Sequence, residues 1–242
     1  MDPVRAGVRM IAVKRPFEFL LVLLVFTASA FQGLSADTTD LKTVLGRIES
    51  FYRKSPGIVA DFTQILESRT FPKPQVEAGI VSLKPPGKMR WEYSIPRGKV
   101  AVTDGTRAFL YLPEDREVLV GSVEQLDAGA MPTRLLLGQV SLESEFQIEG
   151  EMARENPDLW ILKLTPLKGD FPYNSLVLEV ARESGAIRCI RMLDPLGNRL
   201  EYRFERIRVV KDLPEKLFIY RIPRGVEIQT FGEAPAPRPA SP

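Results

Sequence analysis

Apolar residues recur at every second position along most of the chain after residue 57, which is the spacing of β-strands that bury one face. The runs end at turn-forming sequences such as Asp104-Gly105 and Glu183-Ser184-Gly185. The eleven or twelve expected strands lie at 58–68, 76–84, 88–94, 99–103, 106–112, 116–122, 145–150, 159–165, 174–181, 186–194, 199–209 and 216–222. A flat open sheet of that width is unusual and exposes long edges, so we expect an antiparallel meander that curls.

Two segments show helical spacing instead. The first follows Asp40, a capping residue, and ends before Ser55-Pro56-Gly57. Its apolar positions recur every three or four residues, at Leu41, Val44, Leu45, Ile48, Phe51 and Tyr52. The second is shorter, spans 131–138, and has Pro132 near its start and Gly138 as its stop. We interpret the first as a helix packed on the sheet and both segments as candidates for a cover over it.

One face of the predicted sheet is strongly apolar. Met89, Trp91 and Tyr93 alternate with Arg90 and Glu92, so the two sets point to opposite faces. Three further aromatic residues are assigned to the apolar face, namely Phe62, Phe109 and Tyr111. Such a face fits either an ordinary packed core or the wall of a ligand cavity. One substantial helix and one short segment can cover only part of so many strands. This incomplete cover favours a ligand cavity over a packed core.

The two ends of the chain fall outside this pattern. Four basic residues precede the apolar run 19–26, and Ala28-Ser29-Ala30 offers small residues for cleavage. We expect a signal peptide at 1–30, with cleavage as late as residue 36; an uncleaved anchor is the alternative, because Glu18 borders the apolar run. One domain is expected at 38–228, and a Pro-rich disordered tail at 229–242.

The charge balance bears on the class of partner. Removal of residues 1–30 takes four of the 33 basic and two of the 31 acidic side chains, so 29 of each sign remain. A domain without basic excess lacks the charge that phosphate backbones attract. This argues against nucleic acid as the main partner.

The chain has one cysteine, Cys189, so no intrachain disulfide can form. Lipoproteins carry their acyl groups on a cysteine directly after the signal peptide. Because none stands there, we expect that the protein is not itself lipid-anchored.

Side chains suited to catalysis are scarce. The chain has no histidine, which excludes Ser-His-Asp and Cys-His sites and His-ligated zinc. It has no Gly-rich phosphate loop and no dinucleotide fingerprint. Carboxylate pairs such as Glu143 with Glu145 fit solvated surface charge, and Asp194 with Asn198 fits a tight turn better than a calcium site. We expect no enzyme activity, no metal and no cofactor.

The most specific motif is the stretch 84–93, Lys-Pro-Pro-Gly-Lys-Met-Arg-Trp-Glu-Tyr, followed by Asp104-Gly105. A turn that ends in Pro-Gly, then Arg-Trp-Glu-Tyr, then Asp-Gly about a dozen residues on, resembles the pattern of the LolA family. The resemblance covers most of 38–228 through further elements in the same order: the amphipathic first helix, Asp61-Phe62-Thr63-Gln64, Gly79, Phe109 with Tyr111, the segment 132–137, the turn 194–198, and Phe218 with Pro223-Arg224-Gly225-Val226.

This resemblance implies a mainly β fold of the α+β class: an incomplete antiparallel β-barrel of about eleven strands with a helical lid over its concave apolar face. It implies a periplasmic chaperone that shelters the acyl chains of lipoproteins and carries them from the inner to the outer membrane, without a cofactor. The implied partners are acylated outer-membrane lipoproteins, an inner-membrane ABC exporter of the LolCDE type and an outer-membrane receptor of the LolB type where one exists. We expect a monomer.

Within that fold we expect two groups of functional residues. The lipid-binding cavity is lined by Phe62, Met89, Trp91, Tyr93, Phe109 and Tyr111. The lid presents Leu45, Ile48, Phe51, Leu135, Leu136 and Leu137. The family commonly has an arginine before the Pro-Gly turn that holds the lid closed, whereas this chain has Pro85, so Lys84 and Arg90 are the candidate latch residues.

A different class of function remains open, namely an envelope-stress sensor or regulator that resembles RseB. The N-terminal domain of such proteins has the LolA fold. They also carry a second domain, whereas only the short Pro-rich tail is expected after the sheet here.

Overall fold

The structure, a computed structural model, describes residues 38–123, 131–168 and 171–231 of the 242-residue chain. All of them belong to one unit, Ala36–Pro242. The expected signal peptide at 1–30, its cleavage region and residues 232–242 of the expected tail lie outside the described residues. Among the described helices, none is long and apolar enough to cross a membrane.

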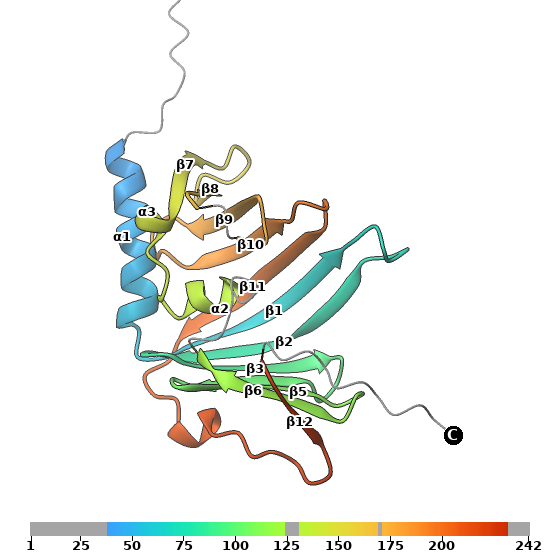
Figure 1. Ribbon diagram of the computed structural model, residues 1–242. Helices are drawn as coiled ribbons and strands as arrows, with labels where there is room; N and C mark the ends of the chain where they lie inside the picture. The colour runs from blue at the N-terminus through green and yellow to red at the C-terminus, as the bar shows by residue number, and fades with distance from the viewer. Residues whose placement is uncertain (1–37, 124–130, 169–170, 232–242) are drawn as a thin grey trace, which may run out of the picture. The chain divides into compact units, whose positions relative to one another are not determined.

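Twelve strands form one curved sheet in the order β12-β6-β5-β4-β3-β2-β1-β11-β10-β9-β8-β7 (Figure 1). Their bounds are β1 (Ile58–Glu67), β2 (Gln75–Lys84), β3 (Lys88–Ile95), β4 (Val100–Asp104), β5 (Arg107–Leu112), β6 (Glu117–Ser122), β7 (Phe146–Met152), β8 (Leu159–Pro166), β9 (Ser175–Ala181), β10 (Ile187–Leu193), β11 (Arg199–Val209) and β12 (Glu227–Thr230). Among these strands β7 and β12 are the two edges, so the sheet is open. The mainly β, incomplete-barrel fold is confirmed.

Eleven of the expected strands are present, but the last one is wrong. Residues 216–222 do not form a strand: η3 (Glu215–Phe218) is a 3₁₀ turn, and the twelfth strand is β12, which pairs parallel to β6. Because β12 extends to Thr230, the expected tail boundary at 228 is also wrong.

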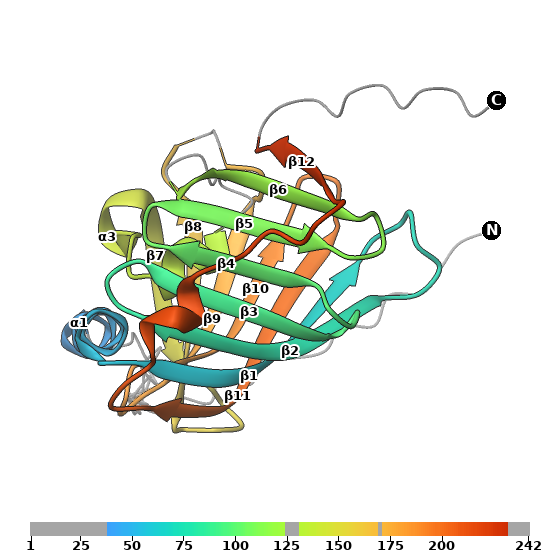
Figure 2. The same ribbon diagram turned by 90° about the horizontal axis from the view of Figure 1, so that it is seen from below.

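The segment that leads to β12 crosses the convex face of β3, β4 and β5 (Figure 2). Leu213 and Phe218 are buried there. The convex face is therefore partly covered by the chain's own C-terminal segment, 210–226.

The long helix α1 (Thr38–Lys54) lies along one end of the sheet (Figures 1 and 2). It begins two residues before Asp40, which therefore sits in the first turn rather than at the cap. Val44, Ile48 and Tyr52 are buried against the sheet, and this one stripe explains the spacing of three and four.

Contacts with the β9–β10 turn fix α1 in place. Gly185 has a φ of +76°, and a Cβ atom built on it would lie 2.3 Å from the carbonyl carbon of Arg47, so no side chain fits. Arg47 donates to the carbonyl oxygen of Arg182 at 2.6 Å, and the backbone N–H of Ile187 donates to the Tyr52 hydroxyl at 3.1 Å. Three independent contacts thus anchor this helix.

Candidate functional site

Five aromatic side chains meet on the concave face of the sheet. The ring centre of Phe62 (β1) lies 4.6 Å from that of Trp91 and 4.9 Å from that of Tyr93 (β3), both edge to face. Trp91 also contacts Tyr202 at 5.7 Å and Phe204 at 6.1 Å, both from β11. Edge-to-face packing of this kind stabilises aromatic clusters beyond the area that they bury.

A glycine lets two of these rings meet across an intervening strand. Gly79 of β2 pairs with Phe62 on one side and with Tyr93 on the other. A Cβ atom at this position would lie 2.0 Å from the carbonyl oxygen of Glu92. Because no side chain rises between Phe62 and Tyr93, the cluster is continuous from β11 to β3.

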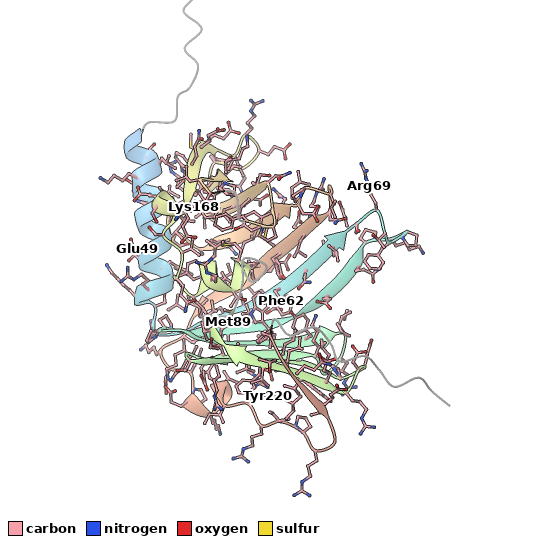
Figure 3. The ribbon with its side chains drawn as sticks, in the orientation of Figure 1. Glu49, Phe62, Arg69, Met89, Lys168 and Tyr220 are labelled. Atoms are coloured by element: carbon pink, nitrogen blue, oxygen red, sulfur yellow. The ribbon has the colours of Figure 1, made fainter. Side chains whose placement is uncertain are left out.

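The concave face is closed in this structure. Met89 is 1% exposed, and its sulfur accepts a hydrogen bond from the Trp91 indole N–H at 2.8 Å. Phe62 and Trp91 are also buried, and Figure 3 shows Phe62 and Met89 on the same side of the sheet. The same apolar cluster includes residues of α1 and of the segment around α2 (Met131–Leu136), so sheet and cover share one core.

Two of the six expected cavity residues lie on the other face. Trp91 pairs with Ala101, whereas Phe109 pairs with Val102, which pairs with Arg90. Phe109 and Tyr111 therefore share the convex face, where both rings pack against Tyr220 of the C-terminal segment. Figure 3 shows Tyr220 on the side of these strands opposite to Phe62 and Met89. The assignment of Phe109 and Tyr111 to the concave face was wrong.

The two candidate latch residues also point away from the cover. The Lys84 ammonium donates to the Leu213 carbonyl oxygen at 2.6 Å and pairs with Glu215 at 2.9 Å. Arg90 donates to the Leu217 carbonyl oxygen at 3.3 Å. Both residues hold the C-terminal segment on the convex face, so neither replaces the arginine expected at Pro85. That Arg90 lies opposite Trp91 follows from strand alternation.

The residues expected on the lid lie on α1 and in or next to α2, and their role as a lid stays a prediction. Ile48, Leu135, Leu136 and Leu137 are buried, while Leu45 and Phe51 are half-buried and pack against the same core. Figure 1 shows α2 inside the curve of the sheet. We call Met131–Leu137 the lid segment; its movement stays a prediction.

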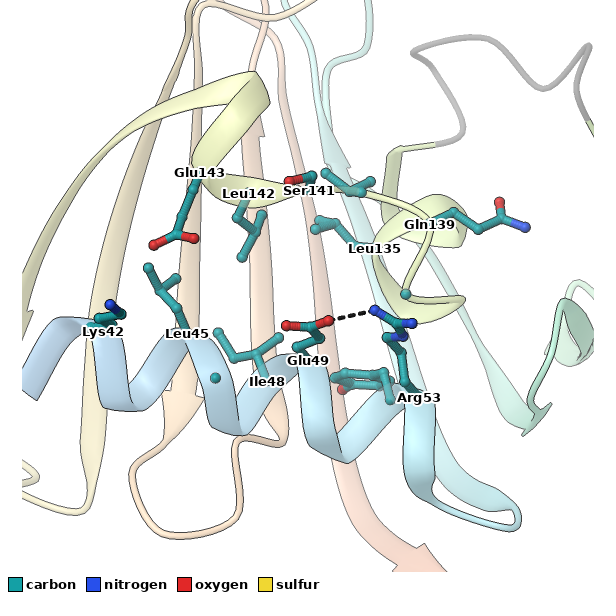
Figure 4. A pocket seen from close by; sticks show the side chains of 14 residues that line it. Lys42, Leu45, Ile48, Glu49, Arg53, Leu135, Gln139, Ser141, Leu142 and Glu143 are labelled. Carbon is teal, nitrogen blue, oxygen red and sulfur yellow. Dashed lines mark hydrogen bonds and ion pairs between the residues drawn. The ribbon is translucent and has the colours of Figure 1, made fainter.

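A pocket of about 440 Å³ separates α1 from the chain that follows the lid segment (Figure 4). Its lining includes Leu45 and Ile48 from α1, and Leu135 and Leu142 from the other side, with α3 (Leu142–Glu145) at its edge. Charged and polar side chains also line it, among them the ion pair of Glu49 with Arg53.

The lid segment is held mainly by apolar contacts. It pairs with none of the described strands, and an ion pair joins its Arg134 to Glu145 at 3.6 Å. By contrast α1 has the three anchoring contacts described above. The lid segment therefore has fewer polar contacts with the rest of the fold to lose than α1 has, so we expect it to move more easily than α1.

A row of polar side chains crosses the concave face, and no expected site residue belongs to it. Glu77 of β2 pairs in register with Gln64 of β1, which pairs with Tyr202. Both carboxylate oxygens of Glu77 accept from the Lys99 ammonium, at 2.7 and 2.8 Å. The ammonium lies 4.4 Å from the centre of the Tyr93 ring.

Burial and nearby charge affect the tyrosines of this region. Desolvation, followed by the neighbouring Tyr202 and Glu77, raises the pKa of Tyr93. Desolvation and then Glu77 raise the pKa of Tyr202. Both phenols therefore stay neutral over the physiological pH range.

The described residues offer little reactive chemistry. They contain no group of three or more His, Cys, Asp or Glu side chains that could hold a metal ion. Cys189 is buried, and desolvation raises the pKa of its thiol to about 12, which keeps it protonated and unreactive.

Comparison with known proteins identifies relatives along most of the chain. The family described as outer membrane lipoprotein carrier protein LolA matches residues 53–221. An outer-membrane lipoprotein carrier protein from Methylococcus capsulatus is 30% identical over 215 residues, which cover 88% of this chain and 97% of the relative. One from Dechloromonas aromatica is 29% identical over 182 residues, 75% of this chain and 85% of that protein.

Two solved structures share the fold at low sequence identity. An uncharacterized conserved protein from Thermus thermophilus has a TM-score of 0.51 at 12% identity and covers 78% of this chain and 98% of its own. The crystal structure of MucB has a TM-score of 0.50 at 15% identity and covers 76% of this chain and 64% of its own. At such identities the likeness shows the fold alone.

Proposed function

The chain belongs to the LolA family of outer-membrane lipoprotein carrier proteins, and we propose that it shelters the acyl chains of lipoproteins and carries them through the periplasm to the outer membrane. The observation that carries this proposal is the concave face, an apolar surface covered by α1 and the lid segment instead of a second sheet. A long acyl chain costs on the order of ten kcal/mol to leave in water, at about 0.8 kcal/mol per methylene. Such a face supplies that shelter without any covalent step.

Cargo can reach the aromatic cluster only if its cover moves, because Phe62, Met89 and Trp91 are buried in the closed form. We assign this movement to the lid segment, Met131–Leu137, because α1 is anchored to the β9–β10 turn. In this proposal residues 1–30 are the export signal and the carrier domain runs from 38 to the end of β12 at Thr230.

The partners in this proposal are acylated lipoproteins, an inner-membrane ABC exporter of the LolCDE type that loads the carrier, and a LolB-type receptor that unloads it. The protein acts as a monomer. Catalysis has no part in this role.

A second candidate, a sensor resembling RseB, is kept because the fold is shared with MucB. The chain covers 64% of MucB but 97% of the lipoprotein carrier protein from Methylococcus capsulatus. The match along the full length of the carrier favours the carrier function.

The test is to purify the protein from a periplasmic extract and identify by mass spectrometry what accompanies it. The proposal expects acylated proteins, and their loss when the acylated cysteine of a chosen cargo is replaced by serine. Capture of that cargo regardless of its acyl groups would contradict the carrier function and favour recognition of protein surfaces.

A further inference from the structure

The ion pair between Glu77 and Lys99 belongs to the polar row on the concave face and lies beside the aromatic cluster. The side chains of Lys99 and Glu77 are 16% and 22% exposed. Register fixes their side of the sheet: β1 and β2 pair without a break, so Glu77 shares the face of Gly79, and the Tyr93 ring beneath Lys99 packs on Phe62. The pair therefore borders the aromatic cluster directly.

An ion pair at this position is not needed to stabilise the fold. Removal of a charged pair from water costs about as much as the attraction returns, and apolar side chains of similar size often stabilise a fold as well or better. Two apolar residues here would also extend the sheltering face. The pair interrupts that face, which points to a role in what the face accepts.

The hydrogen-bonding capacity of the pair suits uncharged polar groups. A lysine ammonium has three donors, and Glu77 takes two of them, so one remains for a carbonyl oxygen. The carboxylate keeps free lone pairs that accept an amide N–H. A ligand with its own carboxylate or phosphate would meet the negative charge of Glu77 beside Lys99, and like charges repel at such distances.

A recess on the same face lies on the β11 side of β1, whereas Glu77 stands on β2, at the other side of that strand. It has a volume of about 230 Å³ and is lined in part by Leu66, Met192 and Leu200. Leu66 follows Gln64 by two residues on β1 and so points to the same side. Along β1, the aromatic cluster at Phe62, the polar row at Gln64 and the recess at Leu66 therefore follow one another.

We propose that Glu77 and Lys99 form a selectivity site, which accepts the uncharged ester and amide groups that join acyl chains to a protein and rejects lipids with anionic head groups; this inference rests on the proposed carrier function. The acyl chains lie toward Met89 and Trp91. Lys99 donates to a carbonyl oxygen at the polar junction, Glu77 accepts from an amide N–H, and the polypeptide leaves through the recess.

Two ligands with the same chain separate selectivity from apolar binding. Palmitamide is neutral, whereas palmitate is anionic at about pH 8. We expect the wild type to bind palmitamide at least about tenfold more tightly than palmitate. Glu77→Gln frees the lysine for the carboxylate, so palmitate should gain about tenfold and the preference should disappear or reverse.

The double variant Glu77→Gln/Lys99→Met removes both charges with little change in volume, which guards against misfolding of the single variant. It should bind the two ligands equally. The matched control is Glu67→Gln/Arg199→Met, which removes an ion pair of 3.4 Å between β1 and β11 at positions whose alternation puts them on the convex face. This control should keep the wild-type preference.

Diphenylhexatriene, which has no polar atom, and a tripalmitoylated cysteinyl peptide test the carrier face itself. If the wild type binds neither, the proposed function fails. If it binds both but shows no preference for palmitamide, or if Glu77→Gln and the double variant keep the wild-type preference, the selectivity site is wrong and the carrier function stands.

Discussion

Truncation of one lid leucine should weaken the fold and tighten lipid binding at once. Leu136 is 3% exposed and packs in the cluster that the lid segment shares with the concave face. Replacement of a buried leucine by alanine costs about 2–5 kcal/mol of unfolding free energy, because apolar contacts are lost and a cavity remains. If acyl chains bind where the lid segment now lies, the same substitution also removes a competitor of the ligand.

The gain in affinity follows from the fraction of molecules in the open form. The apparent dissociation constant equals the intrinsic one divided by that fraction. A loss of about 2 kcal/mol from the closed form raises a small open fraction roughly 30-fold, since about 1.4 kcal/mol corresponds to a factor of ten. The apparent affinity for a lipopeptide should rise by up to that factor and level off once the open form dominates.

Urea unfolding gives the stability, and titration with a tripalmitoylated cysteinyl peptide gives the affinity. The two tryptophans of the chain, Trp91 and Trp160, both belong to the shared core and report binding by fluorescence. Leu178→Ala is the matched control, because this leucine is fully buried in the same cluster but lies on β9. It should lose similar stability without tighter binding. Unchanged or weaker binding by Leu136→Ala, or an equal gain in Leu178→Ala, would refute competition by the lid segment.

Four further outcomes are expected. Met89→Glu should lower the unfolding free energy by on the order of 3 kcal/mol, because it buries a carboxylate without a partner; wild-type stability in urea would mean that the face is open in solution. Glu215 has its pKa lowered to about 2 by hydrogen bonds from two lysines, so its stabilising effect is complete above about pH 4.5 and is lost between pH 4.5 and 2. The melting temperature of Glu215→Gln should therefore fall less over this pH range than that of the wild type. Identical pH profiles of the two proteins would mean that the contacts of Glu215 with the two lysines do not stabilise the fold. Pro85→Arg should favour the closed form and weaken lipopeptide binding in a fluorescence titration; equal dissociation constants would remove position 85 from any latch. Spin labels at Gln139 and Lys42, both exposed, should change their separation when lipopeptide is added, and a fixed distance at saturation would exclude a moving lid segment.

The sequence predicts most strands because their evidence is local. Alternation shows that one face is buried, and turns such as Asp104-Gly105 show where a strand ends. Eleven strands and both covering segments were found in this way. The error at 216–222 has the same origin: Leu213 and Phe218 are buried on the convex face without strand pairing, and apolar spacing does not reveal what buries a residue.

The face of a residue depends on register across a turn, which the sequence does not determine. β4 and β5 pair with Thr103 opposite Ala108, so the residues at 101, 103 and 108 share the concave face and Phe109 does not. A shift of one residue exchanges the faces of an entire strand. The error for Phe109 and Tyr111 is of this kind, whereas Met89, Trp91 and Tyr93 lie on one strand and kept their common side.

Contacts between distant polar residues were not predictable. Glu77 and Lys99 are 22 positions apart, and nothing in their neighbourhoods distinguishes them from other charged residues. The same holds for Lys84 and Arg90, whose partners lie in the C-terminal segment. The sequence shows their charge, whereas the direction of their side chains depends on which face of the sheet the segment 210–226 covers.

Without a guanidinium latch at Pro85, burial itself must keep the cover closed. Full burial of a leucine side chain contributes about 1.5–3 kcal/mol, so Leu135, Leu136 and Leu137 together contribute about 5–9 kcal/mol, less the entropy of ordering the segment. One long acyl chain that leaves water gains on the order of ten kcal/mol. The two quantities are close, so a single chain that enters the concave face can replace the three leucines at little net cost. The reverse exchange is then equally accessible when a receptor competes for the cargo, and a carrier that must both hold and release lipid requires this balance more than it requires a latch.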